Sequence, residues 1–129
     1  MSNSARREAR QYFVPVLLGS NRLSRRISAE IFKKYGIISL VLDRKISFLE
    51  YLNPFSCTYK LEAAEPDLLC REISAVAKQQ SYTLPLLIAT NEKYRDLVSD
   101  FAPSLEPLFV ICDADRLFES SPLCDIENL

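Results

Sequence analysis

Polar side chains follow two apolar runs of the sequence, and their types suit the binding of a small molecule. The runs are Phe13–Leu18 and Leu84–Ala89, and each is followed by residues that favour a turn and then a helix. A glycine lets the backbone approach a ligand closely, and the start of a helix offers unpaired N–H groups and a positive dipole. The predicted substrate-binding residues are Gly19, Ser20, Asn21, Arg22, Thr90, Asn91 and Glu92.

Helix capping is an alternative role for four of these residues. The side chain of a Ser, Thr or Asn ahead of a helix accepts hydrogen bonds from N–H groups of its first turn. Helical patterns follow all four residues, Ser20, Asn21, Thr90 and Asn91. The nearby arginines are equally open to two interpretations. Arg22, Arg25 and Arg26 favour an anionic ligand or form a solvated basic face. The sequence leaves both alternatives open.

Much self-contained chemistry is excluded because the chain has no histidine. Ser-His and Cys-His nucleophile pairs and the usual neutral-pH general base are therefore absent. The cysteines, Cys57, Cys70, Cys112 and Cys124, show no C-x-x-C spacing, so we expect reduced, buried thiols rather than a zinc site. No catalytic or metal-binding residue is predicted.

The residues after the first run also argue against a dinucleotide site. Asp43 follows the second apolar run, where the dinucleotide fingerprint has a carboxylate that binds a ribose hydroxyl. That fingerprint needs G-x-G-x-x-G, and only its first glycine, Gly19, is present. Asn21 would obstruct the approach of a pyrophosphate. We therefore interpret Asp43 as a strand-end or turn residue.

Apolar runs and helical spacing place these residues on a repeating strand and helix pattern. Short apolar runs bounded by turn residues predict buried parallel strands, and i, i+3, i+4 stripes predict helices. The predicted strands are 13–18, 37–42, 57–61, 84–89 and 108–112. The predicted helices follow Ser20 or Asn21 and end at Gly36, run from Pro66 to about Gln80, and follow Thr90 or Asn91 with an apolar face from Tyr94 to Phe101.

Three further segments have weaker patterns. One or two helical turns are predicted between Arg44 and Pro54, and Pro103 and Pro107 are predicted to bracket a loop. A last helical turn containing Leu117 and Phe118 is predicted to open at Asp113 or Asp115.

Alternation of strands and helices predicts the fold class. We expect an α/β, Rossmann-like, doubly wound and mainly parallel sheet of five strands in the order 3-2-1-4-5, with helices on both faces. In that order the chain reverses between the first and fourth strands, so the two polar turns should border one crevice. Residues 1–11 are expected to form a polar arm, 12–119 the domain and 120–129 a tail.

Charge is distributed unevenly, although the net charge is −1. Residues 1–45 carry ten basic and three acidic residues, a net charge of +7, and residues 46–129 carry −8. No basic motif interleaved with aromatic residues is present, so nucleic acid is not an expected partner. No run approaches the roughly 20 apolar residues of a membrane span, and the N-terminus lacks the apolar region of a signal peptide. We expect a soluble, cytoplasmic protein without a membrane partner.

The segments Phe13–Ser20, Lys34–Ile37 and Leu86–Tyr94, in this order and spacing, resemble a known family. Residues 12–119 resemble the N-terminal domain that precedes the ATP-grasp fold in carboxylate–amine ligases, in the group that includes D-aspartate ligase and the large chain of carbamoyl-phosphate synthase. The resemblance implies ATP- and magnesium-dependent activation of a carboxylate as an acyl phosphate, followed by attack of an amine.

That resemblance divides the expected function between two domains. The ATP and metal residues of the family lie in the ATP-grasp domain, and we expect this chain to be truncated before it and inactive alone, with no cofactor of its own. The loops after strands one and four contribute to the carboxylate or amine substrate site in relatives. A stand-alone α/β small-molecule-binding or protein-interaction module is the alternative. An apolar patch at the end of strand five and at Leu117–Phe118 would favour a homodimer.

Overall fold

Five parallel strands form one sheet in the order β3-β2-β1-β4-β5, as predicted. The computed structural model describes residues 13–79 and 84–113. No helix within these ranges is long and apolar enough to cross a membrane. The elements are β1 (Phe13–Leu18), α2 (Arg22–Tyr35), β2 (Ser39–Asp43), α3 (Phe48–Tyr51), β3 (Ser56–Lys60), α4 (Pro66–Gln79), β4 (Leu84–Ala89), α5 (Glu92–Asp100), α6 (Ala102–Leu105) and β5 (Val110–Asp113).

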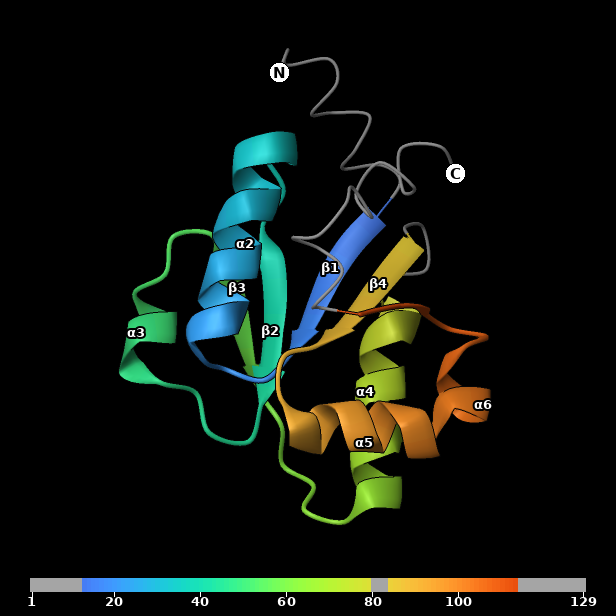
Figure 1. Ribbon diagram of the computed structural model, residues 1–129. Helices are drawn as coiled ribbons and strands as arrows, with labels where there is room; N and C mark the ends of the chain where they lie inside the picture. The colour runs from blue at the N-terminus through green and yellow to red at the C-terminus, as the bar shows by residue number, and fades with distance from the viewer. Residues whose placement is uncertain (1–12, 80–83, 114–129) are drawn as a thin grey trace.

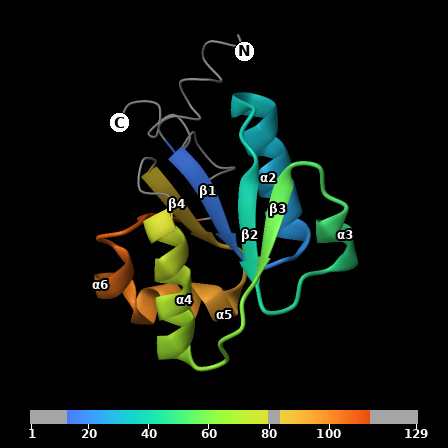
Figure 2. The same cartoon turned by 180° about the vertical axis from the view of Figure 1, so that it is seen from behind.

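Helices cover both faces of the sheet, which confirms the predicted doubly wound α/β class (Figure 1). Helix α2 packs on one face, and α4, α5 and α6 pack on the other, as the view from behind also shows (Figure 2). Neighbouring residues of β1 pack on opposite faces of the sheet, because side chains alternate along a strand. Leu17 belongs to the buried cluster under α2, and Leu18 belongs to the cluster under α4 and α5.

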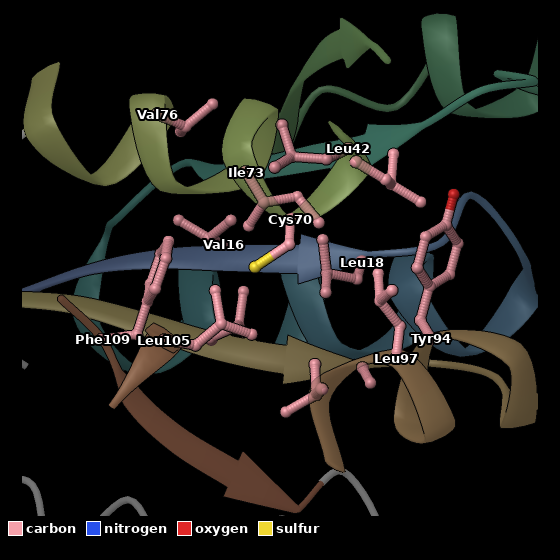
Figure 3. Close-up of a cluster of buried hydrophobic side chains, with 14 of the residues drawn as sticks. Val16, Leu18, Leu42, Cys70, Ile73, Val76, Tyr94, Leu97, Leu105 and Phe109 are labelled. Atoms are coloured by element: carbon pink, nitrogen blue, oxygen red, sulfur yellow. The ribbon is translucent and has the colours of Figure 1, made fainter. Parts of the chain in front are cut away.

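The larger buried cluster joins three helices, α4, α5 and α6, to the sheet (Figure 3). Val16 and Leu18 of β1 lie opposite Ile73 of α4, and Leu105 of α6 and Phe109 fill the β5 side. Burial of such apolar side chains contributes roughly 1.5–3 kcal/mol each. This packing fixes α4 and α5 against the strands whose ends carry the predicted site.

Local signals explain where α2 begins and ends. Asn21 has an extended backbone, and its side chain accepts a hydrogen bond from the Ser24 N–H in a capping box. Gly36 ends the helix with a φ of 70°, a left-handed conformation in which glycine has no Cβ penalty. Lys33 and Lys34 lie in the last turn, where the helix dipole favours cations.

Two strands begin later than the apolar runs predict. Strand β2 begins at Ser39, whose N–H donates to the Phe55 carbonyl at 3.1 Å, while Ile37 is a buried residue of the turn before it. Strand β5 begins at Val110 rather than at residue 108. The N–H groups of Leu108 and Phe109 donate to the Leu105 carbonyl at 3.0 and 2.9 Å, so they cannot join the ladder.

The segment between two prolines is a short helix rather than the predicted loop. Pro103 lies in the first turn of α6, where a missing N–H removes no intrahelical bond. Asp113 is the last residue of β5, and the helical turn expected after it stays a prediction because the following residues lie outside the described part of the chain. Asp115, Leu117 and Phe118 lie outside the described residues, as do the predicted arm and tail.

Candidate functional site

The two polar turns lie side by side at the carboxyl edge of the sheet, because β1 and β4 pair along their whole length. Asn21 Nδ2 donates to Thr90 Oγ1 at 2.9 Å, and the Thr90 hydroxyl lies 2.8 Å from the Leu18 carbonyl oxygen. The Thr90 N–H donates to the same carbonyl at 2.9 Å. The structure therefore brings the predicted residues of the first turn into direct contact with those of the second.

Gly19 makes this contact sterically possible. Its φ is +116°, which side chains rarely tolerate, and a Cβ at this position would collide with Thr90 Oγ1. Asn91 Nδ2 and Asn21 Nδ2 would lie only 3.1 and 3.2 Å from that Cβ. The space that a side chain would need is thus filled by the second turn.

Asparagine caps the helix after each turn. Asn21 Oδ1 accepts from the Ser24 N–H at 2.9 Å, and Asn91 Oδ1 accepts from the Tyr94 N–H at 2.9 Å. Of the alternatives that the sequence left open, Asn21 and Asn91 are therefore the N-caps, and Ser20 and Thr90 are not. The cap uses only the Asn21 Oδ1 atom, so the Nδ2 atom of the same side chain can donate to Thr90. One side chain therefore has two structural roles.

Ser20 connects the first turn to β2 and to the N-cap of α3. Its N–H donates to Asp43 Oδ2 at 2.8 Å, and its hydroxyl accepts from the Ser47 N–H at 3.1 Å. The Ser47 hydroxyl in turn caps α3 by accepting from the Glu50 N–H at 3.2 Å. The turn after β1 is consequently fixed from two directions.

Asp43 has a larger role than the sequence predicts. It does end β2, as expected, but its carboxylate also accepts from three donors. Asp43 Oδ2 accepts from the Ser20 N–H, and Oδ1 accepts from the Tyr94 hydroxyl and the Arg44 N–H, both at 2.7 Å. One carboxylate thereby joins the first turn, the end of β2 and α5.

Tyr94 donates its phenolic proton to this carboxylate. Burial raises the pKa of Tyr94, and the hydrogen bond to Asp43 and the negative charge of that carboxylate raise it further. The phenol therefore remains a neutral donor at physiological pH. Its helical spacing predicted only a core position, which it occupies beside Leu18 and Leu97 (Figure 3).

Arg22 and Glu92 are the exposed charged residues of the predicted site. Each is the first residue of its helix, α2 or α5, and therefore stands where backbone N–H groups begin. The first turn of α2 contains no acidic residue. The edge thus presents a guanidinium and a carboxylate on neighbouring helix starts.

Glu50 is a buried carboxylate that the sequence analysis missed. It lies 2.7 Å from the Ser24 hydroxyl and accepts from Asn53 Nδ2 and the Ser56 hydroxyl, both at 2.9 Å. Ser24 Oγ also accepts from the Asn21 N–H at 2.9 Å, which connects α3 to the candidate site. In the sequence, Glu50 stands among the apolar residues of 48–52, and nothing in that pattern predicts a buried carboxylate that accepts hydrogen bonds.

The cysteines agree only partly with the expectation of buried, reduced thiols. Cys57, Cys70 and Cys112 are free; Cys70 is buried, but Cys57 is exposed because it lies on the edge strand β3. Burial raises the pKa of the Cys70 and Cys112 thiols, which disfavours the reactive thiolate. Cys124 lies outside the described residues. Across 13–79 and 84–113, no three His, Cys, Asp or Glu side chains are grouped so as to hold a metal ion.

Compared with protein-family models and with curated proteins, the sequence matches neither a family model nor a curated relative. The site must therefore be interpreted from its own geometry.

Proposed function

We propose that this chain is the substrate-side domain of an ATP-dependent carboxylate–amine ligase, and that the paired turns after β1 and β4 bind its substrate. One observation carries the proposal: the seven predicted residues gather in two turns joined by the Asn21–Thr90 hydrogen bond of 2.9 Å. They lie where the strand order reverses, the position at which open parallel sheets bind their ligands.

Charge suggests how the two kinds of substrate would be held. Arg22 at the start of α2 suits a carboxylate, because guanidinium and helix dipole both favour an anion there. Glu92 at the start of α5 suits an amine. Gly19, Ser20 and Asn91 would act indirectly. Gly19 leaves room for Thr90 beside the first turn, and Ser20 and Asn91 anchor the two turns through their hydrogen bonds. ATP, magnesium and the catalytic residues would belong to an ATP-grasp domain in cis.

A stand-alone interaction module is the second candidate, and one observation favours it. Helix α3 turns Phe48, Leu49 and Tyr51 outward, with exposed fractions of 59–74%, and Leu52 beyond its end is exposed as well. Patches of large exposed apolar side chains are a feature of protein interaction sites. This candidate requires no substrate at the paired turns.

Kinetics of the full-length natural protein test the first proposal. Its natural reading frame is expressed, and ADP release is followed with pairs of amino acids as carboxylate and amine. Loss of a charged hydrogen bond weakens binding about 10–100-fold. Arg22→Ala should therefore raise the KM of the carboxylate substrate, and Glu92→Gln that of the amine, with kcat changed less than about twofold.

Matched controls are available on the exposed face of α2. Lys33→Ala and Glu30→Gln make the same kinds of charge change away from the turns and should leave both KM values unchanged. A reading frame without an ATP-grasp domain contradicts the ligase proposal. If Arg22→Ala and Glu92→Gln both keep the KM and kcat values of wild type, the paired turns do not bind the substrate.

A further inference from the structure

A basic pocket of about 550 Å³ lies beside the candidate site, at the ends of β2 and β3. We infer that it binds a small multivalent anion through phosphate or carboxylate groups. None of the seven predicted site residues lines it. The inference therefore does not rest on the proposed ligase function. Its charged lining residues are Asp43, Arg44, Lys45, Lys60, Glu62 and Lys93.

Four cations from three parts of the chain meet in this pocket. Arg44 and Lys45 follow β2, Lys60 is the last residue of β3, and Lys93 is the second residue of α5. The register of the sheet explains part of this meeting, because Lys60 pairs with Asp43, directly before Arg44. All four side chains are exposed, and none of them makes an ion pair with another described residue.

The two acidic residues of the pocket cancel only half of this charge. The Asp43 carboxylate already accepts from Ser20, Arg44 and Tyr94, so its oxygens are engaged inside the protein. Glu62 lines the pocket and is exposed. The lining carries a formal charge of +2, and repulsion between its cations would be relieved by an anion with two or more charges.

Structure around the pocket gives it a fixed wall. The Glu72 carboxylate accepts from the backbone N–H groups of Glu62 and Ala63 at 3.0 Å, which fixes the segment after β3. The Leu61 N–H donates to the Asp43 carbonyl at 2.8 Å, so the segment is also tied to β2. Such bonds hold the chain that carries Lys60 in place, and preorganised sites lose less entropy on binding.

Size limits the ligand to a small molecule. Pockets for small ligands span about 300–1,000 Å³, and this pocket lies within that range. Asp43 and Glu62 interrupt the basic surface, which disfavours the continuous phosphate backbone of a nucleic acid. Lysine binds phosphate and carboxylate alike as a point charge, so the two anion sources must be distinguished experimentally.

Isothermal titration of this chain with pyrophosphate and with tricarballylate tests the inference at constant ionic strength. Wild type should bind one equivalent saturably, and the tighter of the two probes identifies the source as phosphate or carboxylate. The double variant Lys60→Gln/Lys93→Gln should bind at least about tenfold more weakly. The control Lys33→Gln/Lys78→Gln removes the same charge at exposed positions of α2 and α4 and should bind within about twofold of wild type.

Two results would overturn the inference. One is the absence of saturable binding of either probe to wild type, and the other is equal weakening in the pocket variant and the control, which indicates diffuse charge alone. Circular dichroism establishes that the variants are folded. If the double variant does not fold, Lys45→Gln provides a second pocket variant. Ligase kinetics do not enter this test, so the two proposals fail separately.

Discussion

At Gly19, the absence of a side chain makes room for a residue of the neighbouring turn. The sequence predicts a glycine that admits a ligand, whereas the structure fills the space beside it with Thr90 of the neighbouring turn. The same turn requires a φ of +116°, so glycine is needed for two reasons. Sequence patterns reveal the glycine and the caps, but not the residue that packs against them.

Gly19→Ala should lower the free energy of unfolding by about 1–3 kcal/mol from backbone strain alone, and the collision with Thr90 Oγ1 should add to it. A double-mutant cycle with Thr90→Ala separates the two contributions, because that variant removes the colliding oxygen. Urea unfolding should show a smaller loss for Gly19→Ala in the Thr90→Ala background than in wild type.

Gly36→Ala is the matched control for this cycle. Gly36 also has a positive φ, 70°, at the end of α2, so alanine there should lower the free energy of unfolding by about 1–2 kcal/mol. Its loss should not change when Thr90 is replaced by alanine. Equal losses for Gly19→Ala in both backgrounds would show that the two turns are not in steric contact.

Helix α3 forms where the apolar pattern predicted helical turns, but it does not bury its apolar residues. Apolar residues between Arg44 and Pro54 predicted one or two helical turns, and a helix of four residues forms there. Its apolar residues point outward, while Glu50 is fully buried and bonded to Ser24, Asn53 and Ser56. A carboxylate that faces inward cannot be predicted from spacing, since its donors lie on α2 and before and within β3.

Glu50→Gln should therefore destabilise the protein although it is nearly isosteric. An amide oxygen is a weaker acceptor than a carboxylate oxygen, so the bonds from Ser24, Asn53 and Ser56 cannot all be kept at full strength. In one of its two orientations the amide also places N–H groups where Asn53 Nδ2 already donates, and a buried donor without an acceptor costs about 1–3 kcal/mol. Urea unfolding should show this loss, and hydrogen exchange should show faster exchange of the α3 amides. Glu30→Gln, on the exposed face of α2, makes the same chemical change and should stay within about 0.5 kcal/mol of wild type. Equal stability of the two variants would contradict an anchoring role of Glu50.

Much of the fold of the whole molecule was predictable from the sequence, for physical reasons. Buried parallel strands need nearly continuous apolar runs, and β1 and β4 match the predicted runs residue for residue. Repeated βα units with right-handed crossovers allow only a few strand orders, and the predicted one, 3-2-1-4-5, is the order observed. In that order the two polar turns follow neighbouring strands and therefore meet.

Contacts between distant residues explain what the sequence could not predict. Asp43 is 23 residues from Ser20 and 51 residues from Tyr94, and no local pattern encodes such a meeting. The basic pocket is a similar case. The sequence shows an excess of basic residues in residues 1–45, but Lys60 and Lys93 of the acidic remainder complete the cluster.

Both faces of the sheet should contribute to one cooperative unfolding transition, because β1 supplies adjacent buried residues to both clusters. Leu17 and Leu18 are each 0% exposed, and each packs under different helices. Leu17→Ala and Leu18→Ala should each lower the free energy of unfolding by about 2–5 kcal/mol, through lost burial and the cavity left behind. Fluorescence and circular dichroism should give coincident urea transitions in both variants, with the slope of wild type. Leu68→Ala on the exposed side of α4 serves as the control and should change stability by less than about 0.5 kcal/mol. Two separate transitions in either variant would show that the layers under α2 and under α4 and α5 fold independently.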